Sequence, residues 1–250
     1  MTLVVFYVSL IPMSIRENVL KIQSQIADAC RAAGRKSDEV TLVAVTKFAP
    51  LEAIQEAINA GVGHIAENRV QEAEKKFPPL LAQNPKIKSH IIGHLQTNKA
   101  KDAIKVSSLI QSVDSLKLAN EIAKQAANPL RGPLHGAGKP VEILVQFNTA
   151  REEQKFGAAP EEAYDLIEAI SRLPYVQIKG LMTMAPFTED EAIIHKTFAA
   201  LREIRDGINE RFKGNSKVDM GIVSMGMSSD YKIAIEEGST MVRVGSAIFK

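Results

Sequence analysis

The stretch TLVAVTKFAPLEAIQEAINAG, residues 41–61, contains a strand and the helix that follows it. Thr41–Thr46 is an apolar run containing β-branched residues, which predicts a buried strand. Apolar residues then recur at helical spacing between Pro50 and Gly61, which are typical first and last residues of a helix. Lys47 stands where the strand should end. In an arbitrary protein such a lysine most often only reaches for water, so its role depends on what the rest of the chain places beside it.

The same alternation recurs along the chain, after a first helix that starts at Ser14 with Glu17 in capping-box spacing. Eight strands alternating with helices in about 250 residues predict a single (β/α)8 TIM barrel of class α/β, with an extra N-terminal helix. A doubly wound open sheet also alternates, but no G-x-G-x-x-G turn follows the first strand. A helix is expected near His94 or Leu95. The other strands are expected at His64–Ala66, Ser89–Gly93, Leu109–Val113, Val141–Asn148, Val176–Met184, Ile222–Gly226 and Met241–Gly245.

The composition is that of an ordinary globular protein, with 45% hydrophobic and 24% charged residues. A net charge of +2 gives no argument for nucleic acid or an anionic membrane as a partner. Cys30 is the only cysteine, so a disulfide within the chain and a cysteine-based metal site are both excluded. We expect no metal site, a monomer, and a cytoplasmic location, with association with mitochondria left open.

The first residues, MTLVVFYVSLIPM, are apolar but do not read as a signal peptide or a membrane span. They have no basic start and no A-x-A-type cleavage site, and they are shorter than the roughly 20 apolar residues that cross a bilayer. We therefore expect residues 1–13 to be an extension that is not native, and the barrel to occupy residues 14–250. An additional edge strand is the alternative interpretation of this segment.

Binding residues in such a barrel lie at the C-terminal ends of the strands. GMSSDYK places Ser228 at a helix start after the seventh strand, and VRVGSAIF places Gly245 and Ser246 after the eighth. Backbone N–H groups and hydroxyls at these positions predict an anion site, and TIM barrels often bind phosphate there. Lys47 stands on the neighbouring first strand, and Arg243 is expected to point at the same mouth. Together they indicate a phosphorylated ligand that carries a carbonyl.

Several polar residues at strand ends also have ordinary structural explanations. Asn68 and Asp114 could be helix caps. His94 could be a satisfied histidine at a helix start.

The motifs VAVTK, ENRVQE, IGHLQTNK, SVDS, GLMTM and SMGMSSDYKIAIEEGSTMVRVGSAIF resemble those of the pyridoxal 5′-phosphate (PLP) homeostasis protein family. That family is similar to the barrel domain of alanine racemases, fold type III of the PLP-binding proteins. The resemblance runs from about Thr41 to Phe249. It implies an intracellular protein that holds PLP, a form of vitamin B6, and delivers it to apo-enzymes.

The resemblance also implies roles for individual residues. It places the Schiff base with the PLP aldehyde on Lys47, and Arg243 near the pyridine nitrogen. Asn68 is placed near the ring, and Ser228, Gly245 and Ser246 at the phosphate. Because an amine must be neutral to attack an aldehyde, we expect Lys47 in a partly desolvated pocket.

The resemblance leaves open whether the protein is an enzyme. Racemases of this fold take a tyrosine as second acid/base from a C-terminal domain of the partner subunit, and inversion needs a proton-transfer group on each face. No such domain follows the eighth strand in this sequence. We therefore expect a carrier and name no catalytic residue. The alternatives are a weak amino-acid racemase or other PLP-dependent enzyme, with His94 or Lys155 as second base, and a regulatory binding module.

Overall fold

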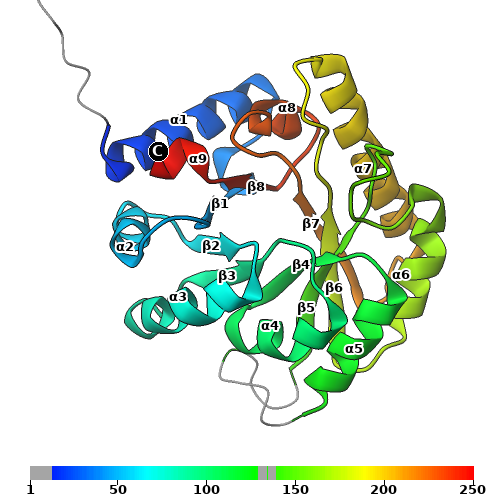
Figure 1. Cartoon of the computed structure of the whole chain (residues 1–250). Coiled ribbons are helices and arrows are strands. Elements are labelled where there is room, and N and C mark those ends of the chain that lie inside the picture. Colours follow the sequence, from blue (N-terminus) through cyan, green and yellow to red (C-terminus); the bar gives the residue numbers. More distant parts are fainter. Residues whose placement is uncertain (1–12, 129–133, 135–138) are drawn as a thin grey trace, which may run out of the picture.

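The computed structural model describes residues 13–128, 134 and 139–250, and these form a closed barrel of parallel strands surrounded by helices (Figure 1). Each strand pairs with the next along the chain, and β8 pairs with β1 to close the barrel. This is the predicted TIM barrel. The strands are β1 Thr41–Val45, β2 His64–Glu67, β3 Lys88–Ile91, β4 Leu109–Val113, β5 Val141–Gln146, β6 Val176–Met182, β7 Val218–Ser224 and β8 Met241–Val244.

Helices follow the strands, and an extra helix, α1, precedes β1 as predicted. In α1 the Ser14 hydroxyl accepts a hydrogen bond from the Glu17 amide, and the Glu17 carboxylate accepts one from the Ser14 amide. Figure 1 shows α1 beside α8 and α9, where the Asn18 side chain donates to the Ile248 carbonyl at 3.0 Å. The helices are α1 Ile15–Ala32, α2 Leu51–Asn59, α3 Val70–Gln83, α4 Ala100–Val106, α5 Leu116–Ala126, α6 Ala163–Ser171, α7 Glu191–Arg211, α8 Tyr231–Glu236 and α9 Ser246–Phe249.

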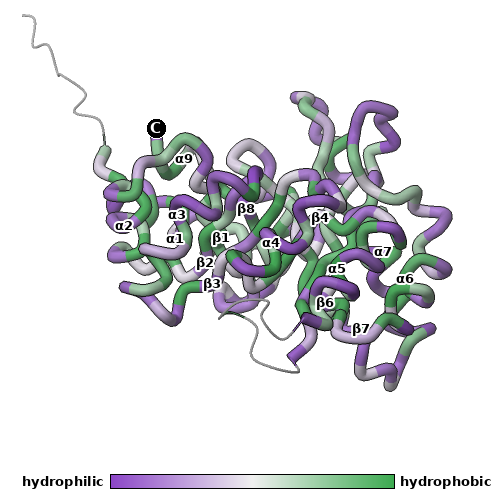
Figure 2. Tube along the Cα trace, turned by 60° about the horizontal axis from the view of Figure 1, so that its bottom comes forward, coloured by the Kyte–Doolittle hydropathy of each residue, from purple (hydrophilic) through white to green (hydrophobic). Residues whose placement is uncertain are grey.

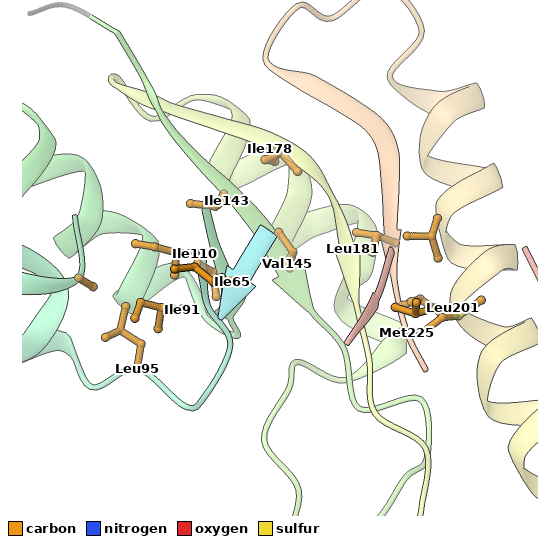
Figure 3. Close-up of a cluster of buried hydrophobic side chains, with 14 of the residues drawn as sticks. Ile65, Ile91, Leu95, Ile110, Ile143, Val145, Ile178, Leu181, Leu201 and Met225 are labelled. Atoms are coloured by element: carbon orange, nitrogen blue, oxygen red, sulfur yellow. The ribbon is translucent and has the colours of Figure 1, made fainter. Parts of the chain in front are cut away.

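Strand side chains alternate between the barrel interior and the layer under the helices. Outward-facing residues such as Ile65, Ile91 and Ile110 lie together in Figure 3, and Leu181 packs near Leu201 of α7. In Figure 2 the central strands are predominantly hydrophobic, and hydrophilic stretches lie on the surrounding helices and loops. A smaller apolar cluster fills part of the interior: Val43, Ala66, Leu109, Leu144, Met182 and Met241. The remaining interior positions are available to polar side chains.

Two boundaries differ from the prediction by several residues, whereas the other strand ends lie within about two residues of their predicted positions. The helix expected near His94 begins later, because a 3₁₀ turn at Thr97–Lys99 precedes α4 and Gln96 is still extended. Strand β7 begins at Val218, four residues before the predicted start at Ile222.

The prediction for residues 1–13 falls almost entirely on residues 1–12, which lie outside the described residues, as do residues 129–133 and 135–138 before β5. Among the helices of the described part, none combines the length and the apolar character that a membrane crossing requires.

Candidate functional site

Lys47 lies at the C-terminal mouth of the barrel, directly after the buried end of β1. The Thr46 amide donates to the Ala66 carbonyl at 2.8 Å, so the β1–β2 ladder continues one residue beyond β1. Thr46 is fully buried, whereas Lys47 is exposed and its amine bonds to no described residue. The amine is therefore free for a ligand, but it lacks the partial desolvation that we expected.

A tight turn explains this exposure. The Ala49 amide donates to the Thr46 carbonyl at 3.0 Å, which reverses the chain at Lys47 and Phe48. Phe48 adopts a positive φ of 69° and its side chain is 95% exposed, so it does not cover the lysine. Positive φ is unusual for a bulky residue, and such strain is concentrated at functional sites.

Asn68 is the next polar residue along the mouth and lies just beyond β2. Its side chain is exposed, and it is not a helix cap, because α3 has Arg69 as its N-cap residue. A Cβ on Gly93 would meet the Asn68 carbonyl oxygen at 2.2 Å, so the absent side chain lets the end of β3 approach Asn68. Asn68 thus follows β2 beside Lys47, which follows β1.

Ser228, Gly245 and Ser246 come together where the barrel closes. The Gly245 amide donates to the Ser228 hydroxyl at 3.3 Å, which joins the loops after β7 and β8. A Cβ on Gly245 would lie 3.1 Å from the Val45 carbonyl oxygen, so the turn after β8 packs closely on the end of β1. The structure therefore brings these residues to the same edge of the mouth as Lys47.

Arg243 lies below the mouth and is buried, with 3% of its surface exposed. Its guanidinium donates to the Ser224 hydroxyl at 2.6 Å and to the Thr183 carbonyl at 2.9 Å. Burial lowers the pKa of Arg243 to about 10, against the attraction of the Asp230 carboxylate, which raises it. The side chain is therefore charged at neutral pH. Two bonds leave N–H donors of the guanidinium uncommitted within the described residues.

Arg243 is one end of a chain of hydrogen bonds inside the barrel, the interior network (His64, His90, Gln111, Ser224 and Arg243). Arginine can only donate, so Ser224 accepts from Arg243 and donates to the Gln111 carbonyl oxygen at 2.7 Å. The Gln111 amide then donates to His90 Nδ1 at 2.8 Å, and His90 Nε2 donates to His64 Nδ1 at 2.9 Å. Burial, with smaller contributions from His64 and Lys88, lowers the pKa of His90 to about 3. The side chains of the interior network are therefore neutral except for Arg243.

A second set of polar contacts, the ionic network (Thr46, Glu67 and Lys76), lies directly beneath Lys47. Glu67 ends β2 and is 1% exposed, and its Oε1 accepts from the Thr46 hydroxyl at 2.7 Å and from the Lys76 ammonium at 2.8 Å. Lys76 also donates to the Thr46 carbonyl at 3.0 Å. Sequence reasoning missed this network. The signal was an acid at the end of an apolar strand, where an unpaired charge would be costly.

On the opposite part of the mouth, His94 and Asp114 lie together. His94 Nδ1 is 3.3 Å from an Asp114 carboxylate oxygen, and its ring stacks on Phe156 at a centroid distance of 3.8 Å. Neither residue caps a helix: α5 is capped by Ser115, whose hydroxyl accepts from the Leu118 amide. The cap interpretation of Asp114 was therefore wrong.

Comparison with known proteins identifies the family. Residues 18–250 match the family model described as "Alanine racemase, N-terminal domain". A pyridoxal phosphate homeostasis protein from Aquifex aeolicus is 37% identical over 93% of this chain and 96% of its own length. The chain belongs to the pyridoxal phosphate homeostasis protein family.

Solved structures agree with this family. A structure described as that of "an unknown protein from Bifidobacterium adolescentis" is similar with a TM-score of 0.87 and 36% identity, over 94% of each chain. PipY of Synechococcus elongatus, solved with PLP bound, is similar with a TM-score of 0.78 and 32% identity, over 95% of this chain and 100% of that chain. The predicted fold and family are both confirmed.

Proposed function

We propose that this protein binds PLP at the C-terminal mouth of its barrel, as a Schiff base on Lys47, and takes part in intracellular PLP homeostasis. One observation carries the proposal. The closure of the barrel brings a strand-end lysine, whose amine bonds to no described residue, to the same edge as the bonded Ser228 and Gly245, in a chain that aligns almost completely with PLP-bound PipY.

The residues at this edge fit the chemical groups of PLP. Ser228 accepts from the Gly245 amide, which leaves the Ser228 hydroxyl proton to be donated to a phosphate oxygen, and Ser246 adds a second hydroxyl. Arg243 has N–H donors for the pyridine nitrogen, and Asn68 is exposed beside Lys47, where it can contact the ring.

The chemistry of this donor set favours holding PLP over catalysis. Bound PLP supplies an aldehyde for linkage to an amine and a ring that withdraws electrons. An arginine at the pyridine nitrogen leaves that nitrogen unprotonated and weakens the electron withdrawal that amino-acid chemistry needs. The buried, charged Arg243 is therefore suited to a protein that stores the cofactor.

The proposal is tested by mixing the purified protein with PLP, reducing with borohydride and mapping the pyridoxyl group by mass spectrometry. We expect a visible absorption band that reduction removes, and the label on the peptide that contains Lys47. Lys47→Ala should lose both. Lys232→Ala removes an exposed lysine in α8 and should retain both. Labelling spread evenly over surface lysines would refute the proposal.

The recipients and the state of the protein belong to the same proposal. We infer a cytoplasmic monomer that hands PLP to apo-enzymes, without nucleic acid or membrane as partner. Light scattering measures the mass in solution, and a stable dimer would contradict the monomer. Incubation of the loaded protein with an apo-transaminase should restore its activity faster than the same total PLP bound to serum albumin.

The racemase alternative requires a second proton-transfer group opposite Lys47. Lys155 donates to the Ala185 carbonyl at 2.8 Å and pairs with Glu152, and His94 is stacked on Phe156. Both candidate bases are thus engaged in contacts of their own. Steady racemisation of an amino acid by the purified protein, abolished in Lys47→Ala, would replace the carrier role with an enzymatic one.

A further inference from the structure

The backbone at Lys47 is held from below by two bonds to one atom. The Thr46 carbonyl oxygen accepts from the Ala49 amide and from the Lys76 ammonium, each at 3.0 Å. This carbonyl belongs to the peptide group that joins Thr46 to Lys47. Its orientation therefore sets the direction in which the Lys47 side chain leaves the turn.

The turn would not keep this shape without support. Phe48, immediately after Lys47, has φ of 69°, a conformation that disfavours a bulky side chain, and its exposed ring gains no packing in return. Turns with positive φ at this position ordinarily use glycine or asparagine. Contacts from neighbouring elements must hold the turn, and the ionic network supplies them.

Stability alone does not account for the ionic network. Glu67 and the Lys76 side chain are 1% and 14% exposed, and two charges lose much of their hydration at such depth. Apolar residues of similar volume are often at least as stabilising as a buried ion pair. What an apolar pair cannot do is bond to both the hydroxyl and the carbonyl of Thr46, as Glu67 and Lys76 do.

We propose that Glu67 and Lys76 are positioning residues which, acting through Thr46, fix the Thr46–Ala49 turn and so present the Lys47 amine to the PLP aldehyde. This inference rests on the proposed function. In this view the ionic network sets the rate at which Lys47 captures PLP. Recognition of the ring and the phosphate is left to Asn68, Arg243 and the residues that follow β7 and β8.

Timed borohydride trapping tests the inference. Glu67→Gln and Lys76→Met each remove one charge at nearly constant size. After mixing with PLP, samples are reduced at intervals and the labelled Lys47 peptide is quantified. We expect the capture rate to fall roughly ten- to a hundredfold, the loss typical of a reacting group displaced by about 1 Å. Exchange of the Ala49 amide hydrogen should accelerate in the same variants without any ligand.

Two controls separate positioning from general damage. Pyridoxine 5′-phosphate has the ring and phosphate but no aldehyde, so the variants should bind it with wild-type affinity. Glu237→Gln alters another poorly exposed carboxylate, which pairs with Arg202 at 2.6 Å and His195 at 2.8 Å and has no contact with the ionic network, so its capture rate should be that of the wild type. If a single variant fails to fold, the double variant Glu67→Gln/Lys76→Met, which leaves no charge unpaired, takes its place.

The outcomes are distinct. Wild-type capture rates in the folded variants would overturn the inference. A parallel loss of pyridoxine 5′-phosphate binding would also overturn it, because the network would then support the whole site. Failure of the wild-type protein to label Lys47 at all would instead refute the proposed function, and this inference with it.

Discussion

Two polar networks reach the mouth of this barrel, and they handle charge in opposite ways. The ionic network places a full ion pair under Lys47, with Glu67 and Lys76 bonded to each other and to Thr46. The interior network runs through neutral groups and carries charge only at its Arg243 end. The first holds a piece of backbone, for which strong bonds from two sides are needed. The second orients the side chain of Arg243, for which a series of hydrogen bonds between neutral side chains is sufficient.

The largest expected effect comes from breaking the ion pair on one side. Glu67→Ala leaves the Lys76 ammonium without its counter-charge at the end of β2, so the free energy of unfolding should fall by about 3–5 kcal/mol. Urea unfolding of the ligand-free protein measures this. Glu237→Ala should cost less, because the partner side chains of Glu237, Arg202 and His195, are 36% and 38% exposed and keep much of their hydration. Equal losses in the two variants would show that burial does not distinguish Glu67.

Acid should weaken the interior network specifically. Burial lowers the pKa of His90 to about 3, whereas a histidine in the unfolded chain titrates near its usual pKa of 6.5. Between these values the unfolded chain binds a proton that the folded protein does not, so stability falls as pH decreases through this window. The contribution is about 1.4 kcal/mol per pH unit, or roughly 2–3 kcal/mol from pH 6.5 to 4.5.

The His90 contribution is measured as a difference between two proteins. His90→Asn should be less stable at pH 7 but lose less stability on acidification than the wild type. Carboxylates and the remaining His64 titrate in both proteins, so they largely cancel. Parallel pH profiles would show that His90 is not the group responsible.

Cutting the interior network next to Arg243 should have a smaller effect on stability but a selective one on the ligand. Ser224→Ala removes the acceptor of the guanidinium and the donor to Gln111, and should cost roughly 1–2 kcal/mol. It should also weaken PLP binding, because Arg243 loses its orientation. Ser239→Ala is the matched control: this serine is equally buried, and its hydroxyl donates to the backbone carbonyls of Val223, Met225 and Met241, so its loss should leave PLP affinity unchanged.

The two networks also mark the limit of what the sequence predicts. Strand β4 was predicted with its observed bounds, because Leu109–Val113 is buried throughout and turn-forming residues follow it. The edge with Lys47 and Gly245 was predictable because parallel strand ends must meet at one mouth. The start of α4 was not, because buried Leu95 imitates the first position of a helical stripe although the chain there is still extended.

Glu67 at the end of an apolar strand signals that it needs a partner, but the contacts that make up the two networks could not be predicted, for physical reasons. The interior network takes one inward-facing residue from each of five strands, so it depends on the register of the barrel, which periodicity does not specify. In the ionic network Lys76 lies nine residues after Glu67, on α3, and only the packing angle of that helix returns its amine to the end of β1. Apolar patterning locates elements, whereas these contacts depend on how the elements are placed against one another.

The smallest expected effect tests whether the ionic network holds a strained turn. Phe48→Gly relieves the positive φ and should raise the free energy of unfolding by about 0.5–1 kcal/mol, whereas Phe48→Ala keeps the Cβ and should change it little. Phe187→Gly is the control and should not raise the free energy of unfolding, because Phe187 is as exposed as Phe48 but has no positive φ.

A double-mutant cycle gives the sharper test. If the ionic network opposes this strain, Glu67→Gln should slow the capture of PLP by Lys47 less in the Phe48→Gly background than in the wild type. Additive effects would mean that Glu67 acts on Lys47 by a route other than the turn.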